Sequence, residues 1–356
     1  MSAGGEQVLR LAVDLLASLA VLAAAAWGAF ALSFKAGGGR ARRLFALTLW
    51  AAVTLAALAL LWSGHLAPGI ALFASAHVLL LAWWRRLTPS NHRPWAEDVA
   101  RLATGTADGD RVTINDVRDF DWRSPTDYTA RWETRQYHLD RLRGVDMIMS
   151  YWRGPSIAHA QFAFCFDDGE PVVFSVEVRR QRDQTFSEIG GFFKQFELCI
   201  LAARERDSVR LRTNVRGEEV YLYRLALGAE ARRSLFLAYV DEANRLASQP
   251  RFYHTVTVNC TTLVYQMMRR IVGRLPLDYR LLFSGYLPEY VYRVGGFGRR
   301  WPLAELRARG RITERARAAD RSPTFSADIR RGVPGIRGGG RRPAGPLDIA
   351  PGCPLR

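Results

Sequence analysis

Three long apolar runs open the chain, before any amphipathic pattern begins. Residues 15–34 and 44–62 carry no charged side chain, and residues 70–84 contain one histidine, His77. A helix needs about 20 apolar residues to cross a bilayer. The first two runs reach that length and the third is shorter, so residues 1–86 are predicted to hold two or three transmembrane helices.

The pattern of apolar and polar residues becomes mixed after these runs. Residues 87–150 are polar and rich in Trp, Asp and Arg, and are predicted to form a connecting segment. Residues 151–306 combine alternating runs, typical of strands, with amphipathic helical runs. Residues 307–356 are dominated by Arg, Gly and Pro, so a disordered tail is predicted because little apolar surface is available to bury.

The middle segment is predicted to be a domain of the α+β class. Its elements do not follow a regular βαβ alternation. Strands are predicted at 157–166, 171–180, 196–201 and 220–225, and helices at 230–248 and 260–271.

The first two strands predict a hairpin with a defined register. Residues 167–169 separate the strands and read Asp-Asp-Gly, and Gly suits the left-handed position of a three-residue loop. This loop places His159 opposite Glu177. The same register places Gln161 opposite Ser175, on the polar face of both strands. A histidine that faces a carboxylate is held in the tautomer that a general base requires.

Cys260 lies where an extended segment gives way to a predicted helix, in the run HTVTVNCTTLV. A thiol at a helix N-terminus has a lowered pKa, and a neighbouring imidazolium lowers that pKa further. Such a thiolate is the nucleophile of papain-like acyl transfer, and the amide at the helix start could form part of an oxyanion hole. A strand His beside a Glu, and a Cys at a helix start, are also compatible with purely structural roles.

The remaining cysteines and histidines are weaker candidates. Cys165 and Cys199 lie in apolar strands and are predicted to be inert, and Cys353 lies in the tail. The cysteine spacing fits no zinc pattern and no disulfide framework. His254 is a rival base, but it lies in the same segment as Cys260. The sequence has neither a phosphate loop nor a cluster of metal ligands, so no cofactor and no metal are expected.

The net charge of +16 is compatible with two kinds of partner. Nucleic acid is one, but Arg is spread along the whole chain and no nucleic-acid module accompanies it. Membrane lipid is the other, because basic residues near anionic headgroups contribute about 1 kcal/mol each. We expect membrane lipid as a partner and no nucleic acid.

Five blocks of sequence resemble one known family, in the same order along the chain. They read PSNHRPWAEDVA, VTINDVRDFDWRSPTDY, AHAQFAFCFDDGEPVVFSVEVRR, GGFFKQFELCILAARERDSVRLRT and FYHTVTVNCTTLV. They are similar to the Lnb-type periplasmic domain, a family that includes the bacterial lipoprotein intramolecular transacylase. The likeness runs over residues 89–294.

The order of these motifs also resembles circularly permuted relatives of papain. A His that precedes an Asn-Cys pair at a helix start is shared with the lecithin:retinol acyltransferase and permuted NlpC-type groups. The resemblance therefore implies a circularly permuted papain-like domain of the α+β class, which follows the N-terminal transmembrane helices that the apolar runs predict. These helices and the Arg-rich tail are a departure from the family.

The resemblance also implies a thiol-dependent acyltransferase or hydrolase. Cys260 would be the nucleophile, His159 the base and Glu177 the orienting acid. The implied substrate is an acylated lipoprotein or another acylated component of the cell envelope. A peptidoglycan amidase or peptidase, and a non-enzymatic binding or scaffold module, remain alternatives.

The side of the membrane on which the domain lies is predicted differently by two arguments. Three spans place the basic loop 35–43 on the same side as the domain, and the positive-inside rule places that loop in the cytoplasm. Two spans would allow the domain to lie outside. The resemblance implies the periplasmic side of the inner membrane, and we predict that side.

Overall fold

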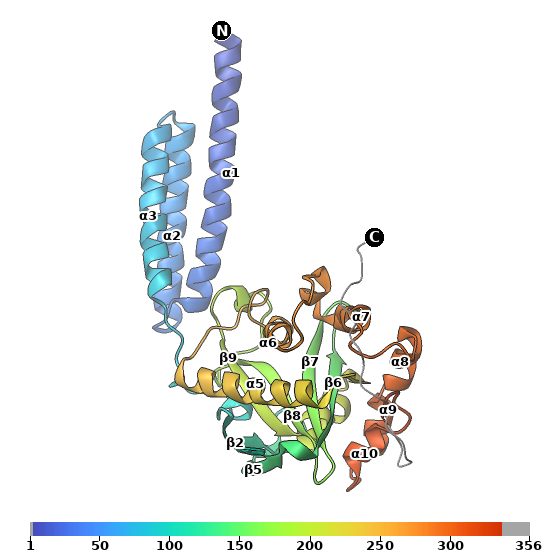
Figure 1. Cartoon of the computed structure of the whole chain (residues 1–356). Coiled ribbons are helices and arrows are strands. Elements are labelled where there is room, and N and C mark those ends of the chain that lie inside the picture. Colours follow the sequence, from blue (N-terminus) through green and yellow to red (C-terminus); the bar gives the residue numbers. More distant parts are fainter. Residues whose placement is uncertain (1–2, 337–356) are drawn as a thin grey trace. The chain divides into compact units, whose positions relative to one another are not determined.

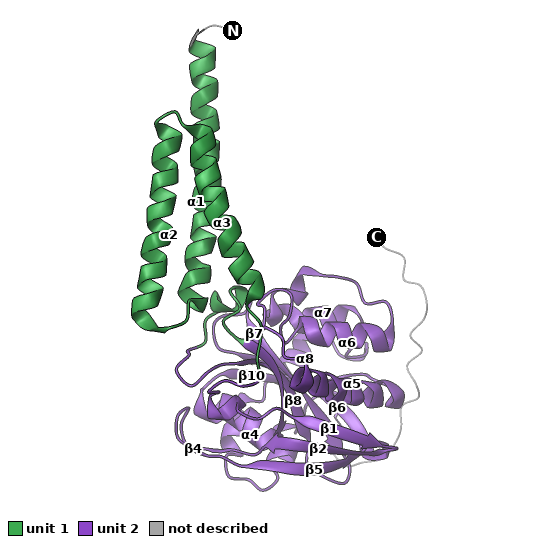
Figure 2. Cartoon of the chain, turned by 90° about the vertical axis from the view of Figure 1, so that its left-hand side faces the viewer, with its two compact units in different colours: residues 1–90, 186–196 green, residues 91–185, 197–356 purple. Residues whose placement is uncertain are grey.

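The computed structural model describes residues 3–336, and the chain divides into two compact units (Figures 1 and 2). Unit 1 contains the chain up to Ser90 together with a later segment, Phe186–Phe196. Unit 2 contains Asn91–Thr185 and the chain from Glu197 onwards. Each unit has its own apolar core.

Unit 1 is built on three helices, α1 (Ala3–Lys35), α2 (Gly39–Trp62) and α3 (Leu66–Arg86). All three are long and apolar enough to cross a membrane. This includes α3, although the apolar run at residues 70–84 that predicted it is shorter than a membrane span. Small residues bring the helices close together. A Cβ at Gly28 would lie 2.5 Å from the ring of Trp50, and the Trp50 indole N–H donates to the Ala25 carbonyl at 2.9 Å.

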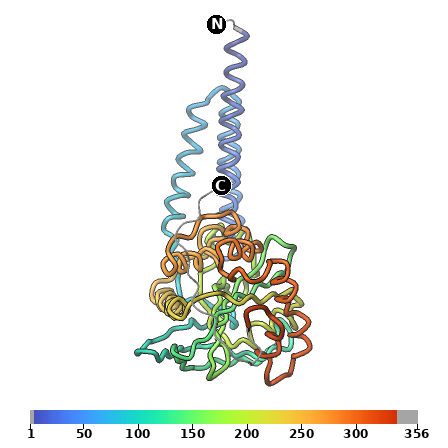
Figure 3. Tube along the Cα trace, turned by 45° about the vertical axis from the view of Figure 1, so that its right-hand side comes forward, coloured from blue at the N-terminus to red at the C-terminus, as the bar shows by residue number. Residues whose placement is uncertain are grey.

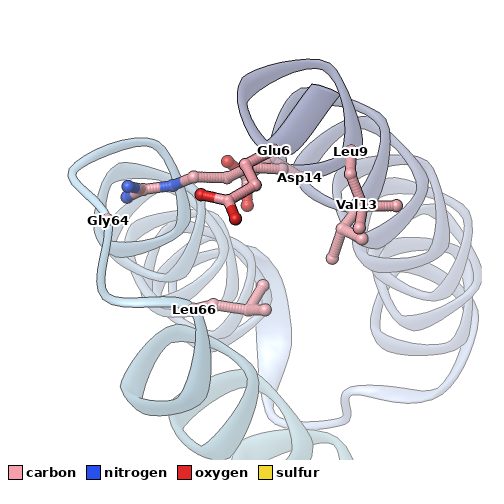
Figure 4. Close-up of a pocket in the computed structure, with 7 residues that line it drawn as sticks. Glu6, Leu9, Val13, Asp14, Gly64 and Leu66 are labelled. Atoms are coloured by element: carbon pink, nitrogen blue, oxygen red, sulfur yellow. The ribbon is translucent and has the colours of Figure 1, made fainter. Parts of the chain in front are cut away.

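The end of unit 1 where α1 begins and α2 joins α3 holds an open pocket (Figure 4). Three charged side chains of α1 gather there, Glu6, Arg10 and Asp14, beside Gly64 and Leu66. They precede the uncharged run of α1 at residues 15–34.

Unit 2 is built on a sheet of eight strands in the order β1-β2-β9-β8-β7-β6-β10, with β5 paired to β2 (Figure 1). The pairs are antiparallel except β2 with β9. The bounds are β1 Thr104–Asp108, β2 Arg111–Arg118, β5 Trp132–His138, β6 Leu142–Tyr151, β7 Ala158–Phe166, β8 Val172–Arg179, β9 Glu197–Arg204 and β10 Glu219–Arg224. A separate pair contains β3 (Asp121–Trp122) and β4 (Tyr128–Thr129). Three apolar helices followed by this unit confirm the predicted α+β class.

The segment 87–150 is not the connecting segment that the sequence predicted. It contributes β1, β2, β5 and most of β6 to the sheet. The buried apolar positions of β2 are Val112, Ile114 and Val117, and less buried polar side chains lie between them. This part of the sheet is half-exposed, so the polar face dominates the composition and conceals the strand period.

Helices cover both faces of the sheet. One face, with Phe162, Phe164 and Phe174, packs against α5 (Ala229–Ser248), α6 (Thr262–Val272) and α7 (Leu287–Arg293). The other face, with Ile148 and Val173, packs against α4 (Glu205–Arg210), α9 (Thr313–Ala318) and α10 (Phe325–Ile329). The polar face that the sequence predicted for β7 and β8 is therefore buried.

The prediction of a disordered tail from residue 307 is wrong as far as residue 336. The segment that begins with α8 (Leu303–Gly310) continues through α9 and α10 along unit 2 (Figure 3). Its few apolar side chains suffice because the sheet already offers an apolar face, and Ile312, Phe325 and Ile329 are buried there. Residues 337–356, with Cys353, lie outside the described residues.

A buried guanidinium fastens this segment to the sheet. Arg330 donates to Asp146 on β6 at 2.9 Å and to both oxygens of Glu205 at 2.5 and 2.6 Å. Asp146 is fully buried and also accepts from Arg224. Burial alone would raise the pKa of Asp146, but the two guanidinium groups lower it overall, so the carboxylate stays ionised.

Arg330→Ala is expected to destabilise unit 2 by about 3–5 kcal/mol, because buried Glu205 loses its guanidinium partner and buried Asp146 keeps only that of Arg224. Denaturant unfolding of the detergent-solubilised chain, followed by tryptophan fluorescence, measures the change. Arg331→Ala is the matched control, since Arg331 is exposed and pairs only at the surface, and its effect should stay within about 0.5 kcal/mol. Equal small effects of both variants would contradict a structural role for the Arg330 network.

Candidate active site

The hairpin of β7 and β8 has the predicted register. Gln161 pairs with Ser175, and this is the last pair of the ladder toward the start of β7. Beyond it β8 continues to pair with β9 only. His159 and Glu177 face each other in the space where the two strands part, with 2.9 Å between Nε2 and Oε1.

A serine hydroxyl joins the histidine to the carboxylate. Ser175 donates its hydroxyl proton to Glu177 at 2.5 Å, so its oxygen accepts from Nε2 of His159 at 2.7 Å. Glu177 accepts from the same nitrogen. Nε2 therefore carries a proton, and Nδ1 remains as the ring atom that can exchange a proton with another group.

Cys260 lies in a capped turn directly before α6. The side-chain oxygen of Asn259 accepts from the backbone N–H groups of Thr261 and Thr262, each at 2.9 Å. Thr262 returns the interaction, because its hydroxyl accepts from the Asn259 N–H at 2.9 Å. These reciprocal interactions have the pattern of a capping box, and they fix Cys260 two residues before the start of α6. The sequence predicted the helix to start at Cys260 itself.

The thiol of Cys260 is buried beside the imidazole of His159. Burial raises the pKa of the thiol. The adjacent imidazole, through its proton and its charge, opposes the effect of burial, together with the backbone N–H of Ala160 and the hydroxyl of Thr261. The balance lowers the pKa of Cys260 below its ordinary value. Ala160 is available for this contact because it lies beyond the last pair with β8.

The imidazole is stabilised in its charged form by the carboxylate. Burial lowers the pKa of His159, but the charge of Glu177, together with the interactions with Cys260 and the Glu177 carboxylate oxygen, outweighs burial and raises the pKa to about 8. Burial raises the pKa of Glu177, and the His159 charge and hydrogen bond then lower it well below its usual range. The arrangement therefore favours a thiolate and imidazolium pair beside a permanent carboxylate.

Arg212 is a site residue that sequence reasoning missed. It lies in a π-helical turn, Leu211–Val215, and donates to Glu177 at 3.3 Å and to Glu218 at 3.2 Å. Glu218 also accepts from the Ser150 hydroxyl. Arg212 holds the carboxylate in place, while its charge opposes protonation of the imidazole. No sequence signal separates this arginine from the many others in the chain.

The rival base has a structural role. Nδ1 of His254 accepts from the backbone N–H groups of Val256 and Thr257 at 3.3 and 3.2 Å. This closes the turn that leads into Cys260. Within residues 3–336, no group of three or more His, Cys, Asp and Glu side chains could hold a metal ion.

The other described cysteines differ from Cys260 in their environment. Burial raises the pKa of Cys199 to about 12 and also raises that of Cys165 well above its ordinary value. Neither thiol has an imidazole beside it. Both observations agree with the prediction that these two thiols are inert.

Alkylation of Cys260 is expected to reach half its maximal rate at a pH below 9.0, the ordinary value for a thiol. Loss of the imidazole in His159→Ala leaves a buried thiol without its cationic partner, so the midpoint should move upward. Iodoacetamide labelling across pH 5–10, read by peptide mass spectrometry in a Cys353→Ser background, gives both midpoints. Cys199 is the internal control and should stay unlabelled. A Cys260 midpoint that is the same with and without His159 would contradict the coupling.

Comparison with known proteins relates the part of the chain that carries this site to one protein family. Neither the curated proteins nor the solved structures yield a significant match. The family model for the Lnb N-terminal periplasmic domain matches residues 128–285, a range that includes His159, Glu177 and Cys260. The match and the three apolar helices together indicate a membrane protein with a periplasmic domain. The resemblance to the Lnb N-terminal periplasmic domain family that the sequence motifs predicted is thereby confirmed for this part of the chain.

Proposed function

We propose that the chain is a membrane-anchored thiol acyltransferase or hydrolase that acts on a bacterial lipoprotein or another acylated envelope substrate. The observation that carries the proposal is the series of interacting side chains from Cys260 through His159 to Glu177. These three residues lie within residues 128–285, the range matched by the model of the Lnb N-terminal periplasmic domain family.

The proposed reaction begins with attack of the Cys260 thiolate on the ester carbonyl carbon of the substrate. A carbon–sulfur bond forms, and negative charge develops on the carbonyl oxygen. Among the described residues the Cys260 N–H donates no hydrogen bond, so it is free to stabilise that oxyanion. The carbon–oxygen bond then breaks, and the imidazolium of His159 gives its proton to the leaving alcohol.

The second half of the proposed reaction releases the acyl group. Neutral His159 takes a proton from an amine or from water as that group attacks the thioester carbonyl. The carbon–sulfur bond breaks and returns the thiolate, and the proton on His159 restores the ion pair. Glu177 stays ionised throughout and orients the imidazole through Nε2.

A set of exposed apolar side chains near the site, here called the apolar rim, supports the proposal that the substrate is acylated. The segment between α6 and α7 exposes four large apolar side chains, Leu277, Tyr279, Leu282 and Phe283. Its next residue, Ser284, accepts from the backbone N–H of Ala158, the neighbour of His159, at 3.0 Å. Exposed apolar groups that gather beside a reactive site are typical of a surface for an apolar ligand.

The proposed setting is the inner membrane, with α1, α2 and α3 all crossing it and unit 2 in the periplasm. The family match supports the periplasmic side. The basic residues between α1 and α2 then lie on the outer side, against the positive-inside rule. A membrane anchor suits a lipid-bearing substrate, because confinement to one bilayer raises the effective concentration of both partners.

A thioester on Cys260 is the expected intermediate. The full chain in proteoliposomes is mixed with a diacylated or triacylated lipopeptide, quenched in acid and digested. Mass spectrometry should find the Cys260 peptide heavier by one acyl chain, and hydroxylamine should remove that mass. His159→Ala should reduce turnover about 10²–10⁴-fold, the usual contribution of a general base.

Cys260→Ala is the matched control, and it should lack both the adduct and the turnover. A chain that leaves lipopeptides unchanged but cleaves peptidoglycan fragments through Cys260 would favour an amidase or peptidase. Absence of turnover on both, with an unreactive thiol, would favour a binding or scaffold module.

Leu282→Ser combined with Phe283→Ser is expected to raise KM for long-chain substrates more than for short-chain ones, because the rim contacts the chain and not the reacting bond. A change of about 1–3 kcal/mol per apolar side chain corresponds to roughly 10–200-fold. KM and kcat measured against esters of increasing chain length test this. An equal effect at every chain length would contradict the role of the rim.

A further inference from the structure

The connection between β8 and β9 leaves unit 2 and packs with the membrane helices. Residues Phe186–Phe196 belong to the same compact unit as α1, α2 and α3 (Figure 2). The chain therefore passes between the two units at this connection as well as after Ser90.

The contacts of Phe193 show which part of α1 this connection lies beside. Its ring contacts Trp27, Phe30 and Phe34, with ring centroids 6.4, 5.4 and 5.8 Å away, and it also contacts Trp84 on α3 at 6.3 Å. These contacts cover about two turns of α1, or roughly 10 Å of its length. They fall inside the uncharged run of α1 and not beyond it.

Lys194 fixes the same connection to the end of α3. Its ammonium donates to the carbonyls of Trp84 and Leu87 at 2.8 and 3.5 Å, and lies 4.8 Å from the centre of the Trp84 ring. The last carbonyls of a helix carry partial negative charge and have no partner within the helix. Lys194 adopts a positive φ of 53°, a conformation that a non-glycine residue keeps only when its surroundings stabilise it.

The rest of the connection presents apolar side chains outward. Phe186 and Ile189 are 49% and 51% exposed, and Phe192 is 43% exposed. A short turn holds them, because the Ser187 hydroxyl accepts from the Gly190 N–H at 3.0 Å and the Gly190 carbonyl accepts from the Gln195 N–H at 3.1 Å.

We infer that residues 186–192 form a membrane-inserted loop whose apolar side chains enter the lipid bilayer that α1 and α3 cross. The occupant of this surface is lipid, since Phe193 places the loop beside the apolar part of α1 and Lys194 places it at the level of the α3 terminus. Aromatic and aliphatic side chains next to a basic residue are the combination that proteins place at the boundary between acyl chains and headgroups. The inference requires that α1 and α3 span a membrane, and it does not require the proposed catalysis.

Spin-label accessibility in proteoliposomes tests this loop. Single labels are placed at Ile189→Cys and, in a second variant, at Phe186→Cys, in a full chain that also carries Cys260→Ser and Cys353→Ser. Power saturation compares collision with oxygen, which concentrates in the bilayer, and with a water-soluble nickel chelate. The bilayer control is Leu79→Cys, exposed on α3, and the water control is Asp168→Cys in the β7–β8 turn.

The expected result is an oxygen-to-nickel collision ratio at residues 186 and 189 shifted from the Asp168 value toward the Leu79 value. A ratio equal to that of Asp168 at both positions would place the loop in water and overturn the inference. Exclusion of both reagents would mean that protein covers the loop, and would overturn it as well. The Cys260→Ser background has no thiol nucleophile, so neither result depends on the proposed function.

Discussion

The site depends on the point where β7 and β8 stop pairing. An uninterrupted ladder beyond Gln161 and Ser175 would engage the backbone of Ala160 and close the space above it. Because the strands part, the Ala160 N–H reaches the thiol of Cys260, and His159 and Glu177 meet across the opening. The capped turn before α6 positions the sulfur atom of Cys260 at that opening. A single irregularity in the sheet thus assembles groups from three segments that are far apart in sequence.

Pairing with a guanidinium recurs at several deeply buried carboxylates of unit 2, namely Asp146, Glu205 and Asp207. Asp207 accepts from both Nε and Nη2 of Arg118 at 2.8 Å, and from the Trp122 indole N–H at 2.7 Å. Asp146 is held by Arg330 in the same manner. Part of the arginine content therefore serves structure, whereas the sequence favoured anionic headgroups as the explanation for the basic charge. Glu177 differs because its principal partner is a histidine, and a histidine can lose its proton near neutral pH.

Local patterns allowed the sequence to predict the hairpin and the cysteine turn, but not the sheet as a whole. Alternation and an Asp-Asp-Gly loop specify which residues of β7 and β8 face each other, since a slip by one residue would reverse every side chain. Arg212 was beyond reach because its contact with Glu177 depends on a π-helical turn and on the packing of α4. The ordered part of the C-terminal segment was missed for a similar reason. Its few apolar residues are insufficient alone, and become sufficient only against a sheet face that no local pattern reveals.

The chain passes between the two units a second time at Phe186–Phe196, in addition to the passage after Ser90. The second passage is continuous with β8, the strand that carries Glu177, and with β9, which pairs with it. The loop that we infer to enter the bilayer is therefore covalently continuous with the strands that carry the proposed site. A lipid-bearing substrate is confined to the same bilayer, and this confinement raises the effective concentration of the two partners in the proposed reaction.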